Sequence, residues 1–192
     1  MFTVRPVTSL FSRYAVASLL ACGLIGCASL TRMPSTPALR LAPATLGKEL
    51  SVAQHLDIEF AGQVRGVDAL LEVDATQTRL AVLQLGQTVA RLSWDGQTLD
   101  ESLAPGWPRY ISGEQVLTDL QYVWWPRAQI QAALPDGWTL RDEPPRRTLL
   151  HDGQLVLDMQ STGDGVIDMR HLDTGYRVRI RTQGDQPEFA AP

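Results

Sequence analysis

Few side chains in this 192-residue sequence have the types and spacing that catalysis requires. The three histidines, His55, His151 and His171, are widely separated, and we interpret them as exposed strand residues in preference to a metal triad. Asp57 and Glu59 share one strand face, which favours a solvated surface over a carboxylate pair for acid–base chemistry. Motifs for a serine nucleophile, a zinc protease or a phosphate-binding glycine loop are missing from the sequence. We therefore predict that the protein is not an enzyme and uses no metal or dissociable cofactor.

Cys27 is the residue whose surroundings predict a defined chemical modification. A positively charged region with Arg5 and Arg13 precedes an apolar stretch, residues 14–25, that is short for a membrane-spanning helix. The stretch ends in Leu24-Ile25-Gly26-Cys27, which looks like the lipobox of bacterial lipoproteins. That resemblance implies cleavage before Cys27, a diacylglyceryl group on its thiol and an N-acyl chain on its new amino group. Several acyl chains would anchor the protein firmly, since each buried CH₂ contributes about 0.8 kcal/mol.

The residues around Cys27 also bear on processing and location. Cys22 is a weaker acylation candidate because it would shorten the apolar stretch, and a plain signal peptide or an uncleaved anchor is the alternative interpretation. Ala28-Ser29 follows Cys27 in place of an aspartate, which by resemblance to enterobacterial lipoproteins favours export to the outer membrane. We expect a signal peptide at residues 1–26 and a mature protein lipid-anchored at the periplasmic face of the outer membrane.

The rest of the sequence is that of an acidic globular domain. Two of the 17 Lys and Arg residues, Arg5 and Arg13, precede Cys27, whereas all 21 acids follow it, which leaves a net charge of about −6. Such a charge argues against general nucleic-acid binding. Both cysteines lie in the N-terminal stretch, which excludes a disulfide framework or a cysteine zinc site in the domain. We expect a monomer.

Composition also predicts where the domain begins and ends. Pro34, Pro37 and Pro43 prevent a regular helix in residues 27–46, which we interpret as a lipidated, proline-rich tether. A domain is expected at residues 47–183, and a flexible tail at residues 184–192.

Alternation of apolar and polar residues predicts strands on both sides of a helical section. Ser112 is a candidate N-cap for a helix that Pro126 ends, and a second helix is expected at 127–134. Short turns imply antiparallel neighbours, so the order predicts an α+β fold with one curved antiparallel sheet and helices packed into it. The expected strands are 55–60, 67–74, 79–85, 88–94, 138–141, 148–151, 154–160, 166–172 and 176–182.

Four segments follow one another in a distinctive order and spacing, namely Trp124-Trp125-Pro126, residues 132–138, residues 152–156 and residues 175–181. In this respect residues 46–183 resemble the LolA/LolB lipoprotein-carrier fold. Within that fold, the chain is similar to the LolB-like outer-membrane lipoproteins of unknown function that occur beside aryl polyene biosynthesis genes. The resemblance implies a half-barrel, a curved antiparallel sheet whose concave face is covered by helices.

The resemblance also implies a membrane-contact loop. In LolB a projecting turn carries a Leu-Gly pair, and its leucine helps to pass lipoproteins into the membrane. The matching position is Leu85-Gly86, in a turn that is shorter and lacks the preceding proline. An ordinary end-of-strand core leucine is the alternative. The shorter turn favours a related lipid-handling task over the activity of LolB itself.

An apolar cavity under the helical lid is the predicted binding site. Five tryptophans suit either a core or a cavity mouth, and the strand at 79–85 is apolar on both faces and should be covered on both. Cavity walls of this kind would suit acyl chains, whereas simple core packing of the same residues is the alternative. The expected lid is Val116, Leu120, Trp124 and Trp125, and the expected opposite wall is Leu71, Val73, Leu83, Leu92, Leu157 and Met159.

A basic row marks the last predicted strand, where Arg177, Arg179 and Arg181 alternate with apolar residues. The row could meet lipid phosphates. We favour the solvated face of an edge strand, where charge discourages aggregation.

Together these features favour a non-enzymatic factor that binds or transfers lipid, lipoprotein or an aryl-polyene-type lipid during envelope assembly. The alternative is a membrane-tethered scaffold or interaction module for an envelope complex, with a solidly packed half-barrel and no ligand. An enzyme acting on lipids has the least support, because no nucleophile or base stands out.

Overall fold

The structure, a computed structural model, describes residues 33–190. Cys22, Cys27 and the expected signal peptide lie outside the described residues. Within the described part of the chain, no helix is long and apolar enough to cross a membrane.

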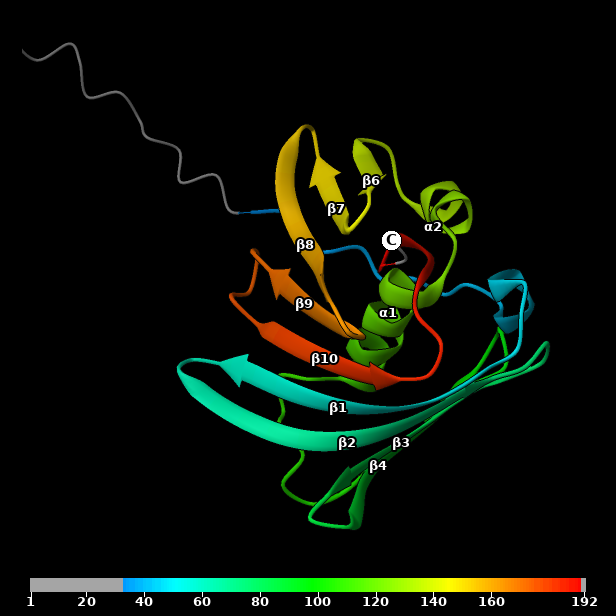
Figure 1. Cartoon of the computed structure of the whole chain (residues 1–192), viewed down its shortest axis with the longest axis vertical. Helices are drawn as coiled ribbons and strands as arrows, with labels where there is room; N and C mark the ends of the chain where they lie inside the picture. Colours follow the sequence, from blue (N-terminus) through cyan, green and yellow to red (C-terminus); the bar gives the residue numbers. More distant parts are fainter. Residues whose placement is uncertain (1–32, 191–192) are drawn as a thin grey trace, which may run out of the picture. The chain divides into compact units, whose positions relative to one another are not determined.

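Ten antiparallel strands form one continuous sheet, and two helices separate the fifth strand from the sixth (Figure 1). All nine expected strands and both expected helices are present, with shifted ends. The additional strand is β5, an edge strand whose middle residues are exposed, so its sequence lacks a buried apolar face. The strands are β1 (Leu50–Phe60), β2 (Gln63–Val73), β3 (Thr78–Gln84), β4 (Gln87–Trp94), β5 (Leu99–Leu103), β6 (Trp138–Glu143), β7 (Arg146–His151), β8 (Gln154–Gly163), β9 (Val166–His171) and β10 (Arg177–Gln183). The helices are α1 (Gly113–Trp124) and α2 (Arg127–Ala133), and short 3₁₀ turns lie at Pro43–Leu46 and Glu188–Ala190.

The strand order explains how the sheet is assembled. It runs β5-β4-β3-β2-β1-β10-β9-β8-β7-β6, so two five-stranded meanders meet where β1 pairs with β10. The chain therefore starts at the middle of the sheet, reaches one edge at β5, crosses to the other edge at β6 and returns to the middle. The strand β10 is central, so our expectation of an edge strand there is wrong.

The crossing between the two edges places the helices. Helix α1 lies within the concavity of the sheet (Figure 1). The Ser112 hydroxyl accepts a hydrogen bond from the backbone N–H of Gln115, as expected for an N-cap. Helix α2 packs beside edge strand β6, where the Gln131 side chain bonds Trp138 O and Leu140 N. These bonds occupy backbone groups that an open edge would leave unpaired.

Alternation along the strands separates an inner, buried face from an outer, polar face. In β10, Val178, Ile180 and Thr182 are buried, and the arginines between them point outward. The same period continues through the neighbouring strands, so one apolar core fills the concave side. These features confirm an α+β fold with a curved, unclosed antiparallel sheet.

Residues 33–46 are not a free tether. Leu39 and Leu46 are buried in the core, and the indole N–H of Trp94 donates to Leu41 O at 2.7 Å. The prolines do prevent regular helix, as expected, but they leave backbone groups free to bond the domain. We call residues 36–46 the strap.

The C-terminal segment is also part of the core within the described residues, so a flexible tail at 184–190 is wrong. Phe189 is buried, and the Arg147 guanidinium lies 4.7 Å from its ring centre. Arg147 is fully buried, with both carboxylate oxygens of Asp142 at 2.7 Å. It also donates to Tyr122 O and Trp125 O, so one side chain joins β6, β7, the end of α1 and the C-terminus.

Replacing Arg147 by alanine should lower the free energy of unfolding by about 3–5 kcal/mol, because it leaves the Asp142 carboxylate and two carbonyls without their partner. Urea unfolding of Arg147→Ala measures the change. The exposed Arg141→Ala on β6 is the control and should change stability by less than about 0.5 kcal/mol. Equal effects of the two substitutions would contradict this role of Arg147.

Candidate functional site

An apolar pocket lies between helix α1 and the inner face of the sheet. Helix residues Val116, Leu120 and Trp124 face Val82 and Val178 of the sheet across it. Its remaining lining is mostly apolar and comes from β1, β2, β3, β9, β10, the β9–β10 turn, the segment before α1 and α1 itself. The free volume is about 70 Å³, whereas cavities that hold benzene in other proteins measure about 150 Å³. The pocket is therefore narrow in this structure.

The structure brings together only part of the predicted cavity. Val116, Leu120 and Trp124 line it as expected. The other predicted residues do not, and most are ordinary core: Leu71, Val73, Leu92, Leu157, Met159 and Trp125 are buried elsewhere under the sheet and helices. Lining residues that the sequence did not single out include Leu56, Ile58, Val67, Met169 and Ile180.

Leu83 lies on the other side of the sheet. It pairs with Asp68, whose neighbours Val67 and Ala69 point inward, and a bulge between Val82 and Leu83 shifts the register to β4. We expected β3 to be covered on both faces. This is wrong near its C-terminal end, because only the face with Leu80 and Val82 is buried.

Three polar side chains border the pocket: Gln54, Asp119 and Tyr176. Gln54 donates to the Thr182 hydroxyl at 3.0 Å. The indole N–H of Trp124 is buried and has no hydrogen-bond partner among residues 33–190. The pocket therefore has mostly apolar walls and three polar side chains, and one of its wall residues, Trp124, has an unbonded indole N–H.

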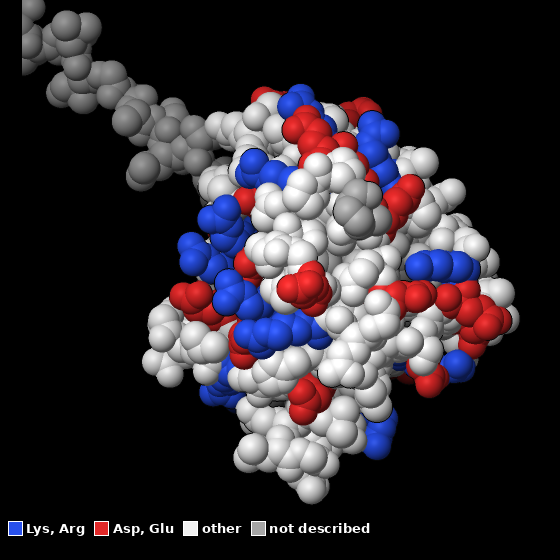
Figure 2. Space-filling view, in the orientation of Figure 1, with Lys and Arg blue, Asp and Glu red and all other residues white. Residues whose placement is uncertain are grey.

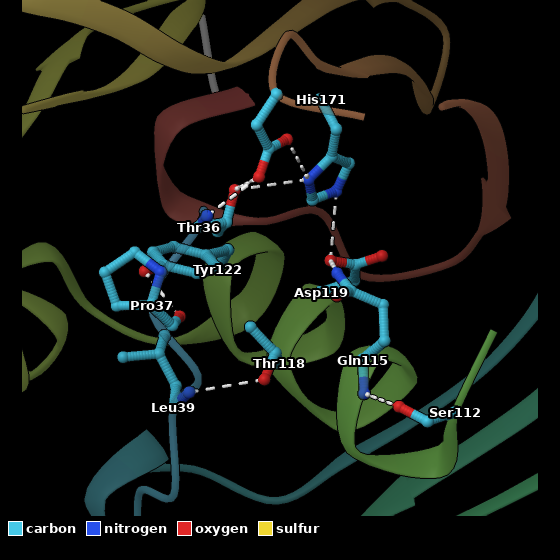
Figure 3. A network of polar contacts seen from close by, with 10 residues as sticks. Thr36, Pro37, Leu39, Ser112, Gln115, Thr118, Asp119, Tyr122 and His171 are labelled. Carbon is cyan, nitrogen blue, oxygen red and sulfur yellow. Dashed lines mark hydrogen bonds and ion pairs between the residues drawn. The ribbon is translucent and has the colours of Figure 1, made fainter. Parts of the chain in front are cut away.

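Beside the pocket, a buried histidine joins three separate segments (Figure 3). The Nε2 atom of His171 is 3.1 Å from Asp119 Oδ1 on α1, and its Nδ1 atom is 3.4 Å from the Thr36 hydroxyl and 3.9 Å from Asp173. The ring packs on Tyr176. Our interpretation of His171 as an exposed strand residue is wrong.

Charge is the main force in the His171 cluster. The imidazole Nε2 and the Asp119 carboxylate form a buried ion pair at 3.1 Å. Burial alone would lower the pKa of His171, but the nearby carboxylates of Asp119 and Asp173 outweigh it and raise the pKa above its usual value. The cluster therefore favours a protonated imidazolium.

The strap holds α1 over the pocket. The backbone N–H of Leu39 donates to the Thr118 hydroxyl, and the Tyr122 hydroxyl donates to Pro37 O (Figure 3). Gln121 bonds both the N–H and the carbonyl of Leu41, at 3.0 and 2.9 Å. Successive turns of the helix are thus fastened to the strap by directional bonds, which proline-rich composition did not reveal.

A second pocket of about 240 Å³ adjoins the first at the segment between β5 and α1. Trp107 and Ile111 line both pockets, and the Trp107 indole donates to Ile111 O at 2.6 Å. Ile58 and Val67 of the sheet also line both pockets, and we call the two shared residues outside the sheet, Trp107 and Ile111, the partition. Gln84 and Val89, which flank the β3–β4 turn, line this second pocket, which we call the outer pocket.

The β3–β4 turn projects a leucine into solvent. Leu85 is 97% exposed and has a left-handed backbone, with φ of 50°, followed by Gly86 with φ of 75°. Both values match a type I′ turn, in which leucine is unfavourable and asparagine is common. Leu85 is therefore not the buried core residue of the alternative interpretation.

The same end of the sheet carries further exposed apolar residues. Val64 follows the β1–β2 turn, Leu172 lies in the β9–β10 turn, and Tyr110 lies in the segment after β5. Glu59, near the end of β1, pairs with Val64 near the start of β2 and with Arg177 at the start of β10, so the β1–β2 and β9–β10 turns lie at the same end of the sheet. Because neighbouring strands are antiparallel, the β3–β4 turn and the end of β5 also lie at this end. We call Val64, Leu85, Tyr110 and Leu172 the apolar end. Thr36 joins the domain here, through its N–H bond to Asp173 at 2.8 Å.

No group of three metal-ligating side chains occurs among residues 33–190. His55 contacts Asp68 at 2.7 Å, and His151 packs on Trp138. The arginine row of β10 faces solvent, where Arg179 pairs with Asp168 and Arg181 with Asp57.

The His171 cluster should make stability depend on pH. Because the pKa of His171 is raised on folding, its contribution is full below about pH 6.5 and is lost as pH rises through the folded pKa. Urea unfolding between pH 5.5 and 8.5 should therefore show the wild type losing more stability on this rise than His171→Gln. Parallel pH profiles for the two proteins would contradict the ion pair.

Comparison with known proteins places the chain in a family without assigning it a function. A family model described as "Protein of unknown function (DUF3261)" matches residues 51–184, which include both helices and, apart from the first residue of β1, all ten strands of the described part. A search of curated proteins finds no match. The chain, with its strap-held helix over a narrow apolar pocket, belongs to the DUF3261 family of proteins of unknown function.

Proposed function

We propose that this protein is a lipoprotein, acylated at Cys27 and anchored in the outer membrane, that binds or transfers a lipid without enzymatic chemistry. The observation that carries the proposal is the apolar pocket beneath α1. An acyl chain gains free energy by leaving water for such walls and needs no hydrogen bonds from them. An aryl-polyene-type lipid or the lipid of a lipoprotein would meet the same requirement. A LolA/LolB-like half-barrel is part of this proposal.

Cargo entry requires the pocket to widen, since its free volume is about 70 Å³. Two parts could move without breaking the sheet, namely α1, which hydrogen bonds hold to the strap, and the partition of Trp107 and Ile111. The unused N–H of Trp124 would suit an ester or amide carbonyl of the cargo.

The apolar end would be the surface that meets the bilayer. From Cys27 to Thr36 the chain spans at most about 30 Å when fully extended. Thr36 is bonded to the turn that contains Leu172, so a lipid anchor on Cys27 would be tethered near the apolar end. Cargo released through the outer pocket would then reach the membrane beside Leu85.

A membrane-tethered scaffold with no ligand is the second candidate. The narrowness of the pocket favours it, because core packing alone accounts for a space of this size. The two candidates differ in whether lipid is bound.

Native mass spectrometry of residues 28–192, exported to the periplasm and purified without detergent, should detect bound lipid. Leu120→Glu places a charge in the pocket and should abolish the bound mass, because the carboxylate would have to be buried among apolar side chains. Leu83→Glu is the matched control, since it adds the same charge on the outer face of the sheet and should retain lipid. An apo mass for the well-folded wild type, with no uptake of added lipid, would favour the scaffold.

Leu85→Asn should separate stability from membrane contact. Asparagine tolerates the left-handed backbone, so the variant should gain up to about 1 kcal/mol in urea unfolding. It should also lose cosedimentation of residues 28–192 with phospholipid vesicles, whereas Leu85→Met should retain it. Vesicle binding of Leu85→Asn at the wild-type level would rule out Leu85 as a membrane contact.

A further inference from the structure

Three arginines gather on the outer face of β7, β9 and β10, on the opposite side of the sheet from the apolar pocket. Arg146, Arg170 and Arg177 line a depression of about 300 Å³ together with Asp158 and Leu172. The space-filling view shows basic side chains on this flank, with acidic ones between them (Figure 2). We call these three arginines the arginine cluster.

The pairing of the strands places two of these arginines directly opposite each other. Arg177 of β10 pairs with Arg170 of β9, and like charges in such positions are destabilising. The adjacent row of the same sheet does not have this arrangement, because Asp168, Arg179 and Asp57 alternate in sign across β9, β10 and β1. The repulsion between Arg170 and Arg177 is therefore a local exception.

Nearby carboxylates leave much of the cluster's hydrogen-bonding capacity unused. Asp158 is almost fully buried, and each of its oxygens accepts a single bond of 2.7 Å, from Arg146 Nε and from Arg170 Nη2. Arg177 approaches Glu59 only to 4.0 Å, which is too long for a hydrogen bond. By contrast, Arg179 uses both Nε and Nη2 on Asp168.

Charge and shape together indicate the kind of ligand. Asp158 is the one carboxylate among the side chains that line this depression with three guanidinium groups, so its lining is net positive. Arg170 and Arg177 also border a neighbouring depression, where Asp57, Glu59 and Asp168 supply the carboxylates. Free guanidinium donors in a fixed arrangement match the oxygens of a phosphate group. Leu172, which belongs to the apolar end, borders the same depression and would contact hydrocarbon next to that phosphate.

We propose that the arginine cluster binds the phosphate of an anionic glycerophospholipid. The phosphate would lie between Arg170 and Arg177 and neutralise their repulsion, and Arg146 would complete the site. The choice of a membrane lipid over free phosphate rests on the proposed function, which brings the apolar end to a bilayer. The site is distinct from the cargo pocket, because alternate residues of the same strands face opposite ways.

The test is calorimetric titration of the full-length lipoprotein in neutral maltoside micelles, with dihexanoyl phosphatidylglycerol in one arm and inorganic phosphate in the other. Arg177→Gln should weaken phosphatidylglycerol binding by about tenfold or more, since it removes charge-assisted hydrogen bonds. Arg181→Gln is the matched control, with the same charge change on the same strand face outside the depression, and should bind within about twofold of wild type.

Equal affinities of Arg177→Gln and Arg181→Gln, or no binding by the wild type, would overturn the site. Inorganic phosphate binding as tightly as phosphatidylglycerol would overturn the lipid as its ligand. The Leu120→Glu variant keeps this result separate from the proposed function. It should retain phosphatidylglycerol binding at the arginine cluster while losing pocket cargo, and Arg177→Gln should do the reverse.

Discussion

The pairing of β1 with β10 is the constraint on which the rest of the structure depends. Seven residue pairs join segments that lie at opposite ends of the domain sequence, so this contact closes a very long loop. Once it forms, each meander extends outward and β5 and β6 become the two edges. The chain between them must cross the open side of the sheet. Helix α1 therefore lies over the concave face because of the strand order, and its amphipathic sequence suits that place.

Because one short helix covers the concave face of a ten-stranded sheet, polar groups are buried beneath it and need hydrogen-bond or charged partners. The strap, Arg147 and the His171 cluster do this, each by joining segments far apart in the chain. All three act on α1 or on its end. The position of the helix, and with it the width of the apolar pocket, is consequently set by directional and charged contacts around a mostly apolar site.

Side chains alternate between the two faces of a strand, so β9 and β10 have apolar residues on one face and charged residues on the other. Met169 and Val178 face the apolar pocket, whereas their neighbours Arg170 and Arg177 face the outer depression. An amphiphile offers the same two chemistries, hydrocarbon and phosphate. At the apolar end, Leu85 is exposed although its left-handed backbone conformation is unfavourable for leucine.

By itself, the sequence determined nine of the ten strands, the turns, the capped helix and the α+β class, because these depend on local alternation, prolines and glycines. Alternation also identified the lid residues Val116, Leu120 and Trp124, since an amphipathic helix has one apolar face. It did not determine which strands are neighbours, so β10 was placed at an edge, Leu83 was assigned to the wrong face, and the strap and the C-terminal segment were interpreted as loose ends. The partners of His171, Arg147 and Arg177 were decided only by the tertiary structure, because each contact joins segments whose proximity follows from non-local pairing and no local pattern records it.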